Sequence, residues 1–464
     1  MNKTTTHKPT RSSFSLLHQL CNLIPAHLVP KLARDTGVIK RSRTFTPWSH
    51  VVSLLYAQLT HAIGLNAVCD ALRLHSGPLS AVRGATPPSK NALSTANRER
   101  SAQMAQELFY AVLGHLETLH PGFGRERRPR FAFRFKRVIH LVDATTIQLV
   151  ARCLDWAKHR RRKAAAKCHL RLDLQTFLPR FALVDTAGEH ESLRAHEVCA
   201  GVRAGEIVIF DKAYVDFTHL ADLALREVFW VTRAKDNLRC RVVRRLQHGV
   251  QGNILRDDLI VLTNPLVKKV YPVELRRVVA LVEVDGEMRE MVFLTNNLEW
   301  SAQTIADLYR CRWNIEVFFK QIKQTLQLAD FLGNSANAVR WQVWTALLTY
   351  VLLRFCAWLS QWSHSFTRLF ALLRSALWQK LELRSLLEVY GIAGSHKHAH
   401  SSNILNPNLN FVARFLWKLP SECPAAEACG FPMKINNKSQ AICQITFNAP
   451  PLPTRTSLRR PCSK

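Results

Sequence analysis

The spacing of apolar residues changes along the chain, and the change separates a helical part from a mixed part. Up to about residue 130, Trp48–Leu74 and Lys90–Leu116 are long stretches without strand-like alternation, which predicts helices. Pro87-Pro88-Ser89 before the second stretch is typical of a helix start. From Phe131 short apolar runs alternate with helical segments, a pattern that predicts an α/β domain.

The mixed part contains several short runs that are typical of strands. The runs expected to be strands are Val138–Val142, His169–Thr176, Arg180–Val184, Glu206–Phe210 and Val228–Arg233, with helices at Glu189–Ala200 and His219–Arg226. Residues 236–290 interrupt this pattern with further strand candidates, Asp258–Leu262, Arg277–Val284 and Met288–Leu294. Asp285-Gly286 is a favourable two-residue hairpin turn between the last two. We therefore expect a β-rich insertion at about 236–290.

These patterns divide the chain into four parts. We expect a helical amino-terminal domain at 1–130, a catalytic α/β domain at 131–330, a helical part at 331–395 and a weakly ordered tail at 396–464. The most lipid-like stretch, Trp341–Leu359, carries Gln342 and Arg354, so we interpret it as a buried helix.

The charge of the chain indicates a polyanionic partner. The 64 Lys and Arg residues outnumber the 34 Asp and Glu residues, giving a net charge of +30. Nucleic acid is the commonest partner of such a protein, and an anionic membrane surface is the alternative. The 12 cysteines form no C-x-x-C pair, and the first twenty residues contain no secretory signal. Both features favour a reduced protein of the cytoplasm rather than a zinc or disulfide scaffold.

A second helix in the amino-terminal part could contact DNA. Its early turns carry polar and basic residues that can reach phosphates or base edges: Lys90, Asn91, Asn97, Arg98 and Arg100. A solvated basic helix face is the alternative interpretation.

Three carboxylates carry the candidate chemistry. Asp143 and Asp211 each follow an apolar strand. A single Asp at the end of a strand is often just a turn residue, but two of them in one α/β unit are more suggestive of a site. Glu316 lies on a predicted helix from Ala302 to about Ala329. Converging carboxylates would repel one another, and hard divalent cations such as Mg²⁺ prefer oxygen ligands. Two such ions can promote phosphodiester displacement.

The predicted helix also gathers polar residues on one side. At 3.6 residues per turn, Tyr309, Arg312, Glu316 and Lys323 fall within an arc of about 60°, beside the apolar face. Pairs of surface charges such as Arg312 with Glu316 are the alternative reading of this stripe.

This spacing resembles the Y-(2)-R-(3)-E-(6)-K signature of bacterial insertion-sequence transposases of the DDE class. The flanking segments HLVDATTIQL, VIFDKAYVDF and FLTNNLEWSAQTIADLYRCRWNIEVFFKQIKQ also resemble that family, and the likeness covers about residues 10–395. It implies a ribonuclease-H-like core with a β-rich insertion before the catalytic Glu.

The resemblance also implies a role for each matching residue. Asp143, Asp211 and Glu316 would bind two Mg²⁺ (or Mn²⁺) ions, and Tyr309, Arg312 and Lys323 would contact phosphates. Further DNA contacts are expected from Lys212, Lys320, Lys90 and Arg98, with Tyr214 beside the second Asp. Where some relatives place a Trp against a flipped base, this chain has Met291.

The implied reaction is metal-dependent cut-and-paste transposition. Water cleaves double-stranded DNA at the terminal inverted repeats, and the freed 3′-hydroxyl attacks target DNA, with a hairpin intermediate in related enzymes. The family acts as a dimer that pairs two DNA ends. A catalytically silent DNA-binding protein derived from a transposase is the alternative function.

Two other motifs carry less weight. His190-Glu191 begins like H-E-x-x-H, but Arg194 occupies the place of the second histidine. The histidines at 396, 398 and 400 are interpreted as solvated.

Overall fold

The computed structural model describes residues 8–38, 44–124, 135–149, 153–160, 163–186, 188, 190–247, 249–284, 286–326 and 331–392. The tail expected at 396–464, with its three histidines, lies outside the described residues.

Seven helices form the amino-terminal part of the described chain. They are α1 (Leu16–Asn22), α2 (Leu28–Asp35), α3 (Pro47–Thr60), α4 (Leu65–Leu74), α5 (Ser76–Ser80), α6 (Lys90–Glu99) and α7 (Gln103–Leu119). Helix α6 begins as predicted, since the Ser89 side chain accepts a hydrogen bond from the backbone N–H of Ala92. The single helix expected over 90–116 is wrong, because Arg100 is extended (ψ 123°) and separates α6 from α7.

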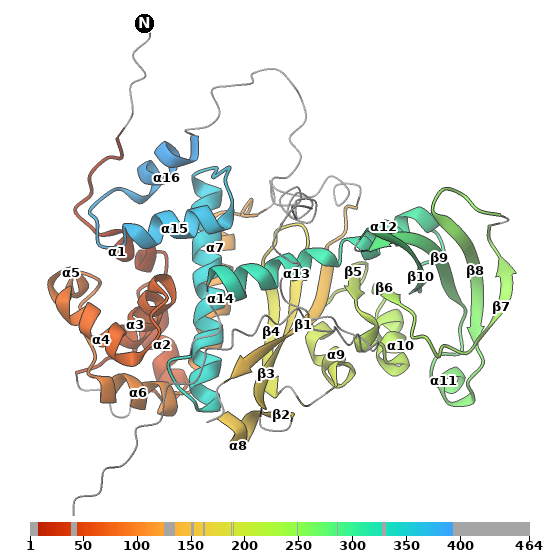
Figure 1. Ribbon diagram of the computed structural model, residues 1–464, viewed down its shortest axis with the longest axis horizontal. Coiled ribbons are helices and arrows are strands. Elements are labelled where there is room, and N and C mark those ends of the chain that lie inside the picture. The colour runs from red at the N-terminus through yellow and green to blue at the C-terminus, as the bar shows by residue number, and fades with distance from the viewer. Residues whose placement is uncertain are drawn as a thin grey trace, which may run out of the picture. The chain divides into compact units, whose positions relative to one another are not determined.

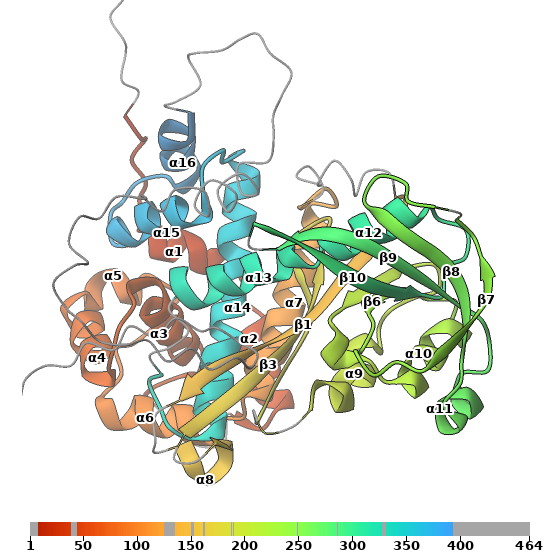
Figure 2. The same cartoon turned by 45° about the vertical axis from the view of Figure 1, so that its right-hand side comes forward.

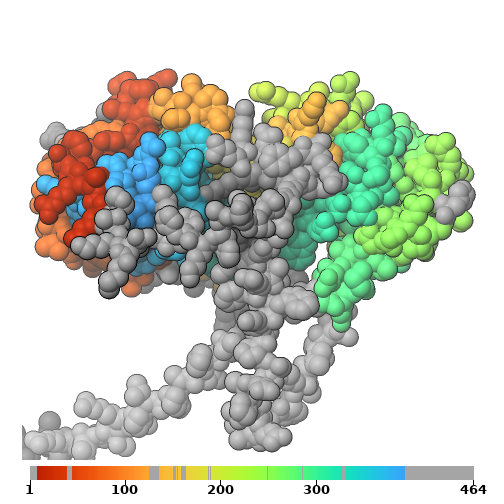
Figure 3. Space-filling model, turned by 90° about the horizontal axis from the view of Figure 1, so that it is seen from above, coloured from red at the N-terminus to blue at the C-terminus, as the bar shows by residue number. Residues whose placement is uncertain are grey.

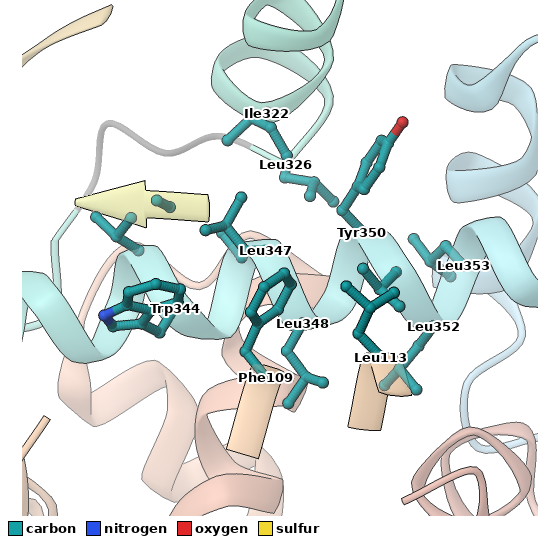
Figure 4. Close-up of a cluster of buried hydrophobic side chains, with 14 of the residues drawn as sticks. Phe109, Leu113, Ile322, Leu326, Trp344, Leu347, Leu348, Tyr350, Leu352 and Leu353 are labelled. Carbon is teal, nitrogen blue, oxygen red and sulfur yellow. The ribbon is translucent and has the colours of Figure 1, made fainter. Parts of the chain in front are cut away.

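Helices from the end of the described chain complete the core of this part. They are α14 (Ala336–Leu359), α15 (Phe366–Ser375) and α16 (Leu383–Ile392). Helix α14 runs between the amino-terminal helices and the sheet, and its apolar side chains meet Phe109 and Leu113 of α7 (Figure 4). The segment before α1 also pairs with this end of the chain through an Arg11–Leu381 bridge, and Figure 3 shows red and blue surfaces side by side.

Polar contacts join the same helices. The Asn337 side chain donates to the carbonyls of Asn97 (2.9 Å) and Arg100 (2.6 Å), and the Trp341 indole donates to the latter carbonyl (2.7 Å). By length and composition α14 could cross a membrane, but 78% of its apolar window is buried inside the protein. This agrees with the prediction of a buried helix.

One mixed sheet occupies the middle of the described chain (Figures 1 and 2). Its strands are β1 (Ile139–Leu149), β2 (Lys158–Arg160), β3 (Lys163–Asp173), β4 (Pro179–Thr186), β5 (Ile207–Phe210), β6 (Phe229–Arg233), β7 (Cys240–Arg245), β8 (Ile254–Leu262), β9 (Leu275–Val284) and β10 (Glu287–Thr295). The order is β2-β3-β1-β5-β6-β10-β9-β8-β7, and β4 pairs with β3. Strands β1, β5 and β6 are parallel, and the other pairs are antiparallel.

Short helices connect these strands and follow the last one. They are α8 (Leu154–Ala157), α9 (Glu191–Cys199), η5 (Lys212–Tyr214), α10 (Phe217–Leu225), α11 (Pro265–Val270), α12 (Ala302–Arg310), α13 (Trp313–Lys320) and the π-helical turn η6 (Gln321–Thr325). The three strands predicted between 258 and 294 are present as β8, β9 and β10. Strand β10 pairs with β6, so these strands extend the same sheet.

Alternation along the parallel strands divides the core into two layers. Ile139, Leu141, Ile207 and Ile209 pack with the apolar residues of α12, α13 and α14. The residues between them, such as Val208 and Phe210, pack with α9 and α10. Successive strand residues point to opposite faces of a sheet. Odd-numbered positions of β1 and β5 therefore face α12 and α13.

Candidate active site

Asp143 and Asp211 are neighbours in the sheet. The parallel pairing of β1 with β5 ends at Val142 and Phe210, so each aspartate is the next residue along its strand. Both have odd numbers and therefore project from the face covered by α12 and α13. The expectation that Asp143 ends its strand is wrong. Strand β1 continues to Leu149, because residues 140–149 pair with β3.

The expected continuous helix over 302–329 is also wrong, because it breaks after Arg310. The backbone N–H groups of Arg312, Asn314 and Ile315 bond three residues back, as in a tight turn, and α13 begins at Trp313. The Cys311 carbonyl accepts both the backbone N–H (3.0 Å) and the side-chain amide (2.8 Å) of Asn314. Despite the break, Tyr309 and Arg312 each reach one of the two aspartates, and Arg312 also reaches Glu316.

Arg312 and Tyr309 hold the three carboxylates in one group. The Arg312 guanidinium donates to Asp143 (Nη1–Oδ2 3.0 Å) and to Glu316 (Nη2–Oε1 2.8 Å). The Tyr309 hydroxyl donates to Asp211 (3.1 Å). We call Asp143, Asp211 and Glu316 with these two partners the carboxylate cluster.

The environment of the carboxylate cluster disfavours the ionised form of Asp143. Burial raises the pKa of Asp143 to about 7, against the opposing effects of Arg312 and the Ala144 N–H; the charges of Asp211 and Glu316 raise it further. Burial alone would lower the pKa of Arg312, but the carboxylates outweigh it and the pKa rises. Burial and then Asp211 raise the pKa of Tyr309, which keeps the hydroxyl protonated as a donor. The arrangement therefore holds excess negative charge that one guanidinium partly balances.

The other residues predicted to bind DNA lie outside the carboxylate cluster. The Lys323 ammonium donates to the Thr146 carbonyl of β1 (2.6 Å), and Lys212 pairs with exposed Asp236 (3.3 Å). Lys320 is exposed on α13. Lys90 and Arg98 are exposed on α6, within the amino-terminal helices, and the structure does not bring them into the cluster.

Two residues that were expected to face DNA, Asn97 on α6 and Arg100 at its end, make contacts inside the protein. Asn97 is 3% exposed, and its side-chain oxygen bonds to the His50 ring (2.8 Å). The Arg100 guanidinium is directed at the carbonyls of Phe45 and Thr46. Both side chains join helices of the amino-terminal part and do not point to solvent.

Further side chains beside the cluster escaped the sequence analysis. Trp313 follows Arg312 and is 46% exposed, with the guanidinium 5.5 Å from its ring centroid. A large exposed aromatic residue beside cationic groups can stack on a base. The helical periodicity could have indicated that Trp313 is exposed, since this residue lies off the apolar face. His169 of β3 gave no signal in the sequence: its Nδ1 lies 2.7 Å from the hydroxyl of Tyr214 in the turn η5, within the apolar layer on the other face of the sheet. Met291 is partly buried on β10, against the core.

Comparison with protein families identifies two regions of the chain. The family described as "Transposase DDE domain" matches residues 134–352, which include the whole carboxylate cluster. A second family, described as "Domain of unknown function (DUF4372)", matches residues 12–82.

Individual relatives are similar over much of the chain. A "Putative transposase y4zB" of Sinorhizobium fredii is 29% identical over 318 residues, which cover 68% of this chain and 85% of the relative. The "Probable transposase for insertion sequence element IS5377" of Geobacillus stearothermophilus is 29% identical over 230 residues, 49% of this chain and 59% of the relative. A solved piggyBac transposase synaptic complex with hairpin DNA aligns over 90% of this chain and 88% of that chain, at 9% identity. The TM-score of this alignment is 0.40.

Proposed function

Because the chain is an insertion-sequence transposase of the DDE class, we propose that Asp143, Asp211 and Glu316 are its catalytic carboxylates. They cut DNA at terminal inverted repeats and join the freed ends to target DNA. The observation that carries this proposal is the Arg312 bridge between Asp143 and Glu316, since it brings residues 173 positions apart into one group. The sheet register adds Asp211 beside Asp143.

The donor atoms of the carboxylate cluster fit divalent metal ions. Three carboxylates supply only hard oxygen ligands, the kind that Mg²⁺ and Mn²⁺ prefer. The raised pKa of Asp143 reflects negative charge crowded into a buried place, which added cations would relieve. When bound, two ions would polarise the scissile phosphate and lower the pKa of an attacking hydroxyl. Asp143, Asp211 and Glu316 would hold them.

Arg312 and Tyr309 have partners that metal ions would compete for. In the free protein the Arg312 guanidinium occupies one oxygen each of Asp143 and Glu316, and Tyr309 occupies one of Asp211. Once cations neutralise the carboxylates, both donors can turn to DNA phosphates. A guanidinium grips phosphate through two parallel hydrogen bonds, which suits Arg312 for orienting the cleaved strand. Trp313 beside it offers a ring on which a displaced base can stack.

DNA would be bound by both parts of the described chain. Lys320, Lys323 and Lys212 would line the path near the cleaved end, and Lys90 with Arg98 would contact the duplex from α6. The net charge of +30 supports a long phosphate track. The parallel β1–β5–β6 order flanked by helices is consistent with a ribonuclease-H-like core, and the paired-end reaction would use a homodimer.

Cleavage of a defined DNA tests this assignment. The substrate is a duplex carrying the inverted repeats that flank the gene, incubated with Mg²⁺ or Mn²⁺. Asp143→Asn, Asp211→Asn and Glu316→Gln keep the size of each side chain and remove its charge. Each is expected to abolish cleavage while end binding persists. Asp236→Asn is the matched control, because this exposed Asp lies outside the carboxylate cluster and pairs with Lys212.

Two results would overturn the proposal. Wild-type-level nicking by any of the three charge-neutral variants would refute the site assignment. Binding of the ends by the wild-type protein without cleavage in either metal would favour the catalytically silent DNA-binding protein.

A further inference from the structure

A second group of ligand-type side chains lies on the opposite face of the sheet from the carboxylate cluster. It consists of His196 on α9 with His219 and Asp222 on α10, two helices that lie side by side in Figure 1. One ligand atom from each of the three residues lies within 4.8 Å of the others. Both helices pack on the apolar layer that contains Val208 and Phe210. The transposition reaction uses none of these side chains.

The sequence spacing explains how two helices can converge on one point. His219 and Asp222 are three residues apart, so α10 presents both on one face. The neighbouring helix supplies His196, whose ring centroid lies 4.9 Å from that of His219. Two imidazoles and one carboxylate from adjacent helices are a ligand set of the kind that binds Zn²⁺.

His219 gives the second, independent observation. Its side chain is 2% exposed, yet neither ring nitrogen has a hydrogen-bond partner among the described residues. Burying an imidazole without hydrogen-bond partners is unfavourable, and buried polar groups in proteins nearly always have a partner. A metal ion that accepts the lone pair of the unprotonated ring nitrogen would give that nitrogen a partner. His219 is therefore a buried polar side chain that the described residues leave unpaired, within 4.8 Å of the ligand atoms of His196 and Asp222.

The surroundings of Asp222 leave one of its oxygens available. Oδ2 accepts from Arg226 (3.1 Å) and lies 3.9 Å from His196 Nδ1. Arg226 is itself fixed by the backbone carbonyls of Cys199, Ala200 and Val202. A simple ion pair accounts for Asp222 and Arg226, but it leaves the two nitrogens of His219 unexplained. The Oδ1 atom remains for a further ligand.

We propose that His196, His219 and Asp222 bind one Zn²⁺ ion, separate from the ions of the carboxylate cluster. Zinc bonds of about 2.0–2.2 Å bring tetrahedral ligand atoms to roughly 3.4 Å from one another, so the group must close slightly on loading. The His196 side chain is 58% exposed and can supply that movement by rotating. Water fills the fourth position, unless Cys199, one turn after His196 on α9, moves into it.

The position of the ion gives it a structural consequence. It ties α9 to α10, and α10 begins six residues after Asp211, behind the turn η5. Helix α9 contacts η5 and strands β3 and β4. Bound zinc would thus link α10, which follows Asp211, through α9 to strands β3 and β4. We expect zinc to raise the melting temperature of the whole protein without replacing Mg²⁺ in cleavage.

Metal binding to the full-length protein tests this proposal. The protein is freed of metal with a chelator and then kept in excess Mg²⁺, which competes for the carboxylate cluster. Titration calorimetry with Zn²⁺ measures binding, and the visible spectrum with Co²⁺ reports the ligand geometry. We expect one Zn²⁺ per chain, a four-coordinate Co²⁺ spectrum and a melting temperature several degrees higher. His196→Gln, the exposed position, should weaken Zn²⁺ binding at least tenfold, as should Asp222→Asn.

Matched variants separate this site from other zinc ligands. His190→Gln changes an exposed histidine just before α9 and should leave Zn²⁺ affinity unchanged. All proteins carry glutamine at 396, 398 and 400, so that the tail histidines cannot contribute. Neutralising Asp143, Asp211 and Glu316 should also leave zinc binding unchanged. Cys199→Ser distinguishes the fourth ligand: loss of a thiolate-to-Co²⁺ absorption band assigns that position to Cys199, and an unchanged spectrum assigns it to water.

Any of three outcomes contradicts the proposal. One is a His196→Gln protein that binds Zn²⁺ as tightly as the wild type. Another is a wild-type protein that binds none once the carboxylates and the tail histidines are neutralised. His219→Gln is measured with its circular dichroism, because this position is buried; a folded variant that still binds zinc normally also counts against the site.

Discussion

Asp143 and Asp211 lie next to each other because the parallel pairing of β1 and β5 stops one residue before both of them. Val142 pairs with Phe210, and the two aspartates follow on the same face of the sheet. Their carboxylates are therefore positioned by backbone hydrogen bonds as well as by side-chain contacts. Asp143 has the firmer support, since β1 continues and pairs with β3 beyond it.

This fixed placement predicts that the length of the side chain matters as much as its charge. Asp143→Glu and Asp211→Glu keep the charge and shift the carboxylate by about one methylene. A misplacement of about 1 Å can cost about 100-fold in rate, so we expect at least that loss of cleavage. Steady-state nicking of inverted-repeat DNA measures it. Asp236→Glu, at an exposed position, should retain the wild-type rate.

The Arg312 bridge predicts a metal-dependent change in stability. Arg312→Gln removes the cation between Asp143 and Glu316, whose side chains are 19% and 41% exposed. Breaking such a pair leaves charges uncompensated, and we expect a loss of about 3 kcal/mol in the free energy of unfolding. Urea unfolding with and without Mg²⁺ measures it, and Mg²⁺ should recover part of the loss.

A surface arginine provides the comparison for this variant. Arg310→Gln removes an ion pair between the exposed Arg310 guanidinium and Asp307 and should cost no more than about 1 kcal/mol, with or without Mg²⁺. Equal losses for the two arginine variants would mean that the bridge does not hold the carboxylates together.

Tyr309→Phe separates hydrogen bonding from packing. The ring contacts Phe293 at 4.8 Å between centroids, and the variant keeps that contact while removing the donor to Asp211. A hydrogen bond to a charged group contributes about 1.5–3 kcal/mol, which corresponds to a roughly 10- to 100-fold slower cleavage. Single-turnover kinetics test this, with Tyr390→Phe, an exposed tyrosine of α16, as the control. An unchanged rate would remove the Tyr309 hydroxyl from the mechanism.

The exposed lysines predict a change in the salt dependence of DNA binding. Each phosphate contact contributes about one unit to the slope of log K against log salt. Lys320→Gln and Lys90→Gln should each reduce that slope by about one, with a uniform loss of affinity across DNA sequences. Fluorescence anisotropy over a salt series measures both quantities. Lys31→Gln, an exposed lysine of α2, is the comparison variant. A slope unchanged by Lys90→Gln would exclude the start of α6 from the DNA-binding surface.

His50 predicts that the amino-terminal helices weaken in acid. Burial lowers the pKa of His50 to about 3, from 6.5 in an ordinary exposed histidine. Below about pH 6.5 the unfolded chain binds a proton that the folded protein refuses, so stability falls as the pH decreases, by up to about 1.4 kcal/mol per pH unit. Unfolding measured at about pH 7.5 and about pH 5.5 should show this loss, and His50→Gln should reduce it. The exposed His27→Gln should show the wild-type dependence.

Local patterns in the sequence predicted much of the sheet and little of its register. The run Glu206–Phe210 before Asp211 predicted β5, because several β-branched and aromatic residues end at a polar one. The extension of β1 beyond Asp143 was not predictable, since the Ala144–Leu149 segment gains its strand conformation from pairing with β3. The spacing of Tyr309, Arg312 and Glu316 identified the candidate site even though the helix between them breaks.

Long-range polar contacts account for the incorrect expectations. Asn97 is of a residue type that often reads DNA bases, but its side chain bonds to His50, 47 positions earlier in the sequence. Periodicity reports which side of a helix is apolar, and it does not report which polar side chain finds a buried partner. The orphaned nitrogens of His219 likewise depend on how α9 and α10 meet.

The hydrogen bonds from Asn337 and Trp341 to the Arg100 carbonyl have a consequence for biosynthesis. The first helices of the chain lack part of their core until α14, more than 200 residues downstream, has left the ribosome. A nascent chain that already carries Lys90 and Arg98 thus acquires its finished basic surface only when Glu316 has also been translated. Premature termination would yield an unstable fragment rather than a competitor that occupies the DNA ends.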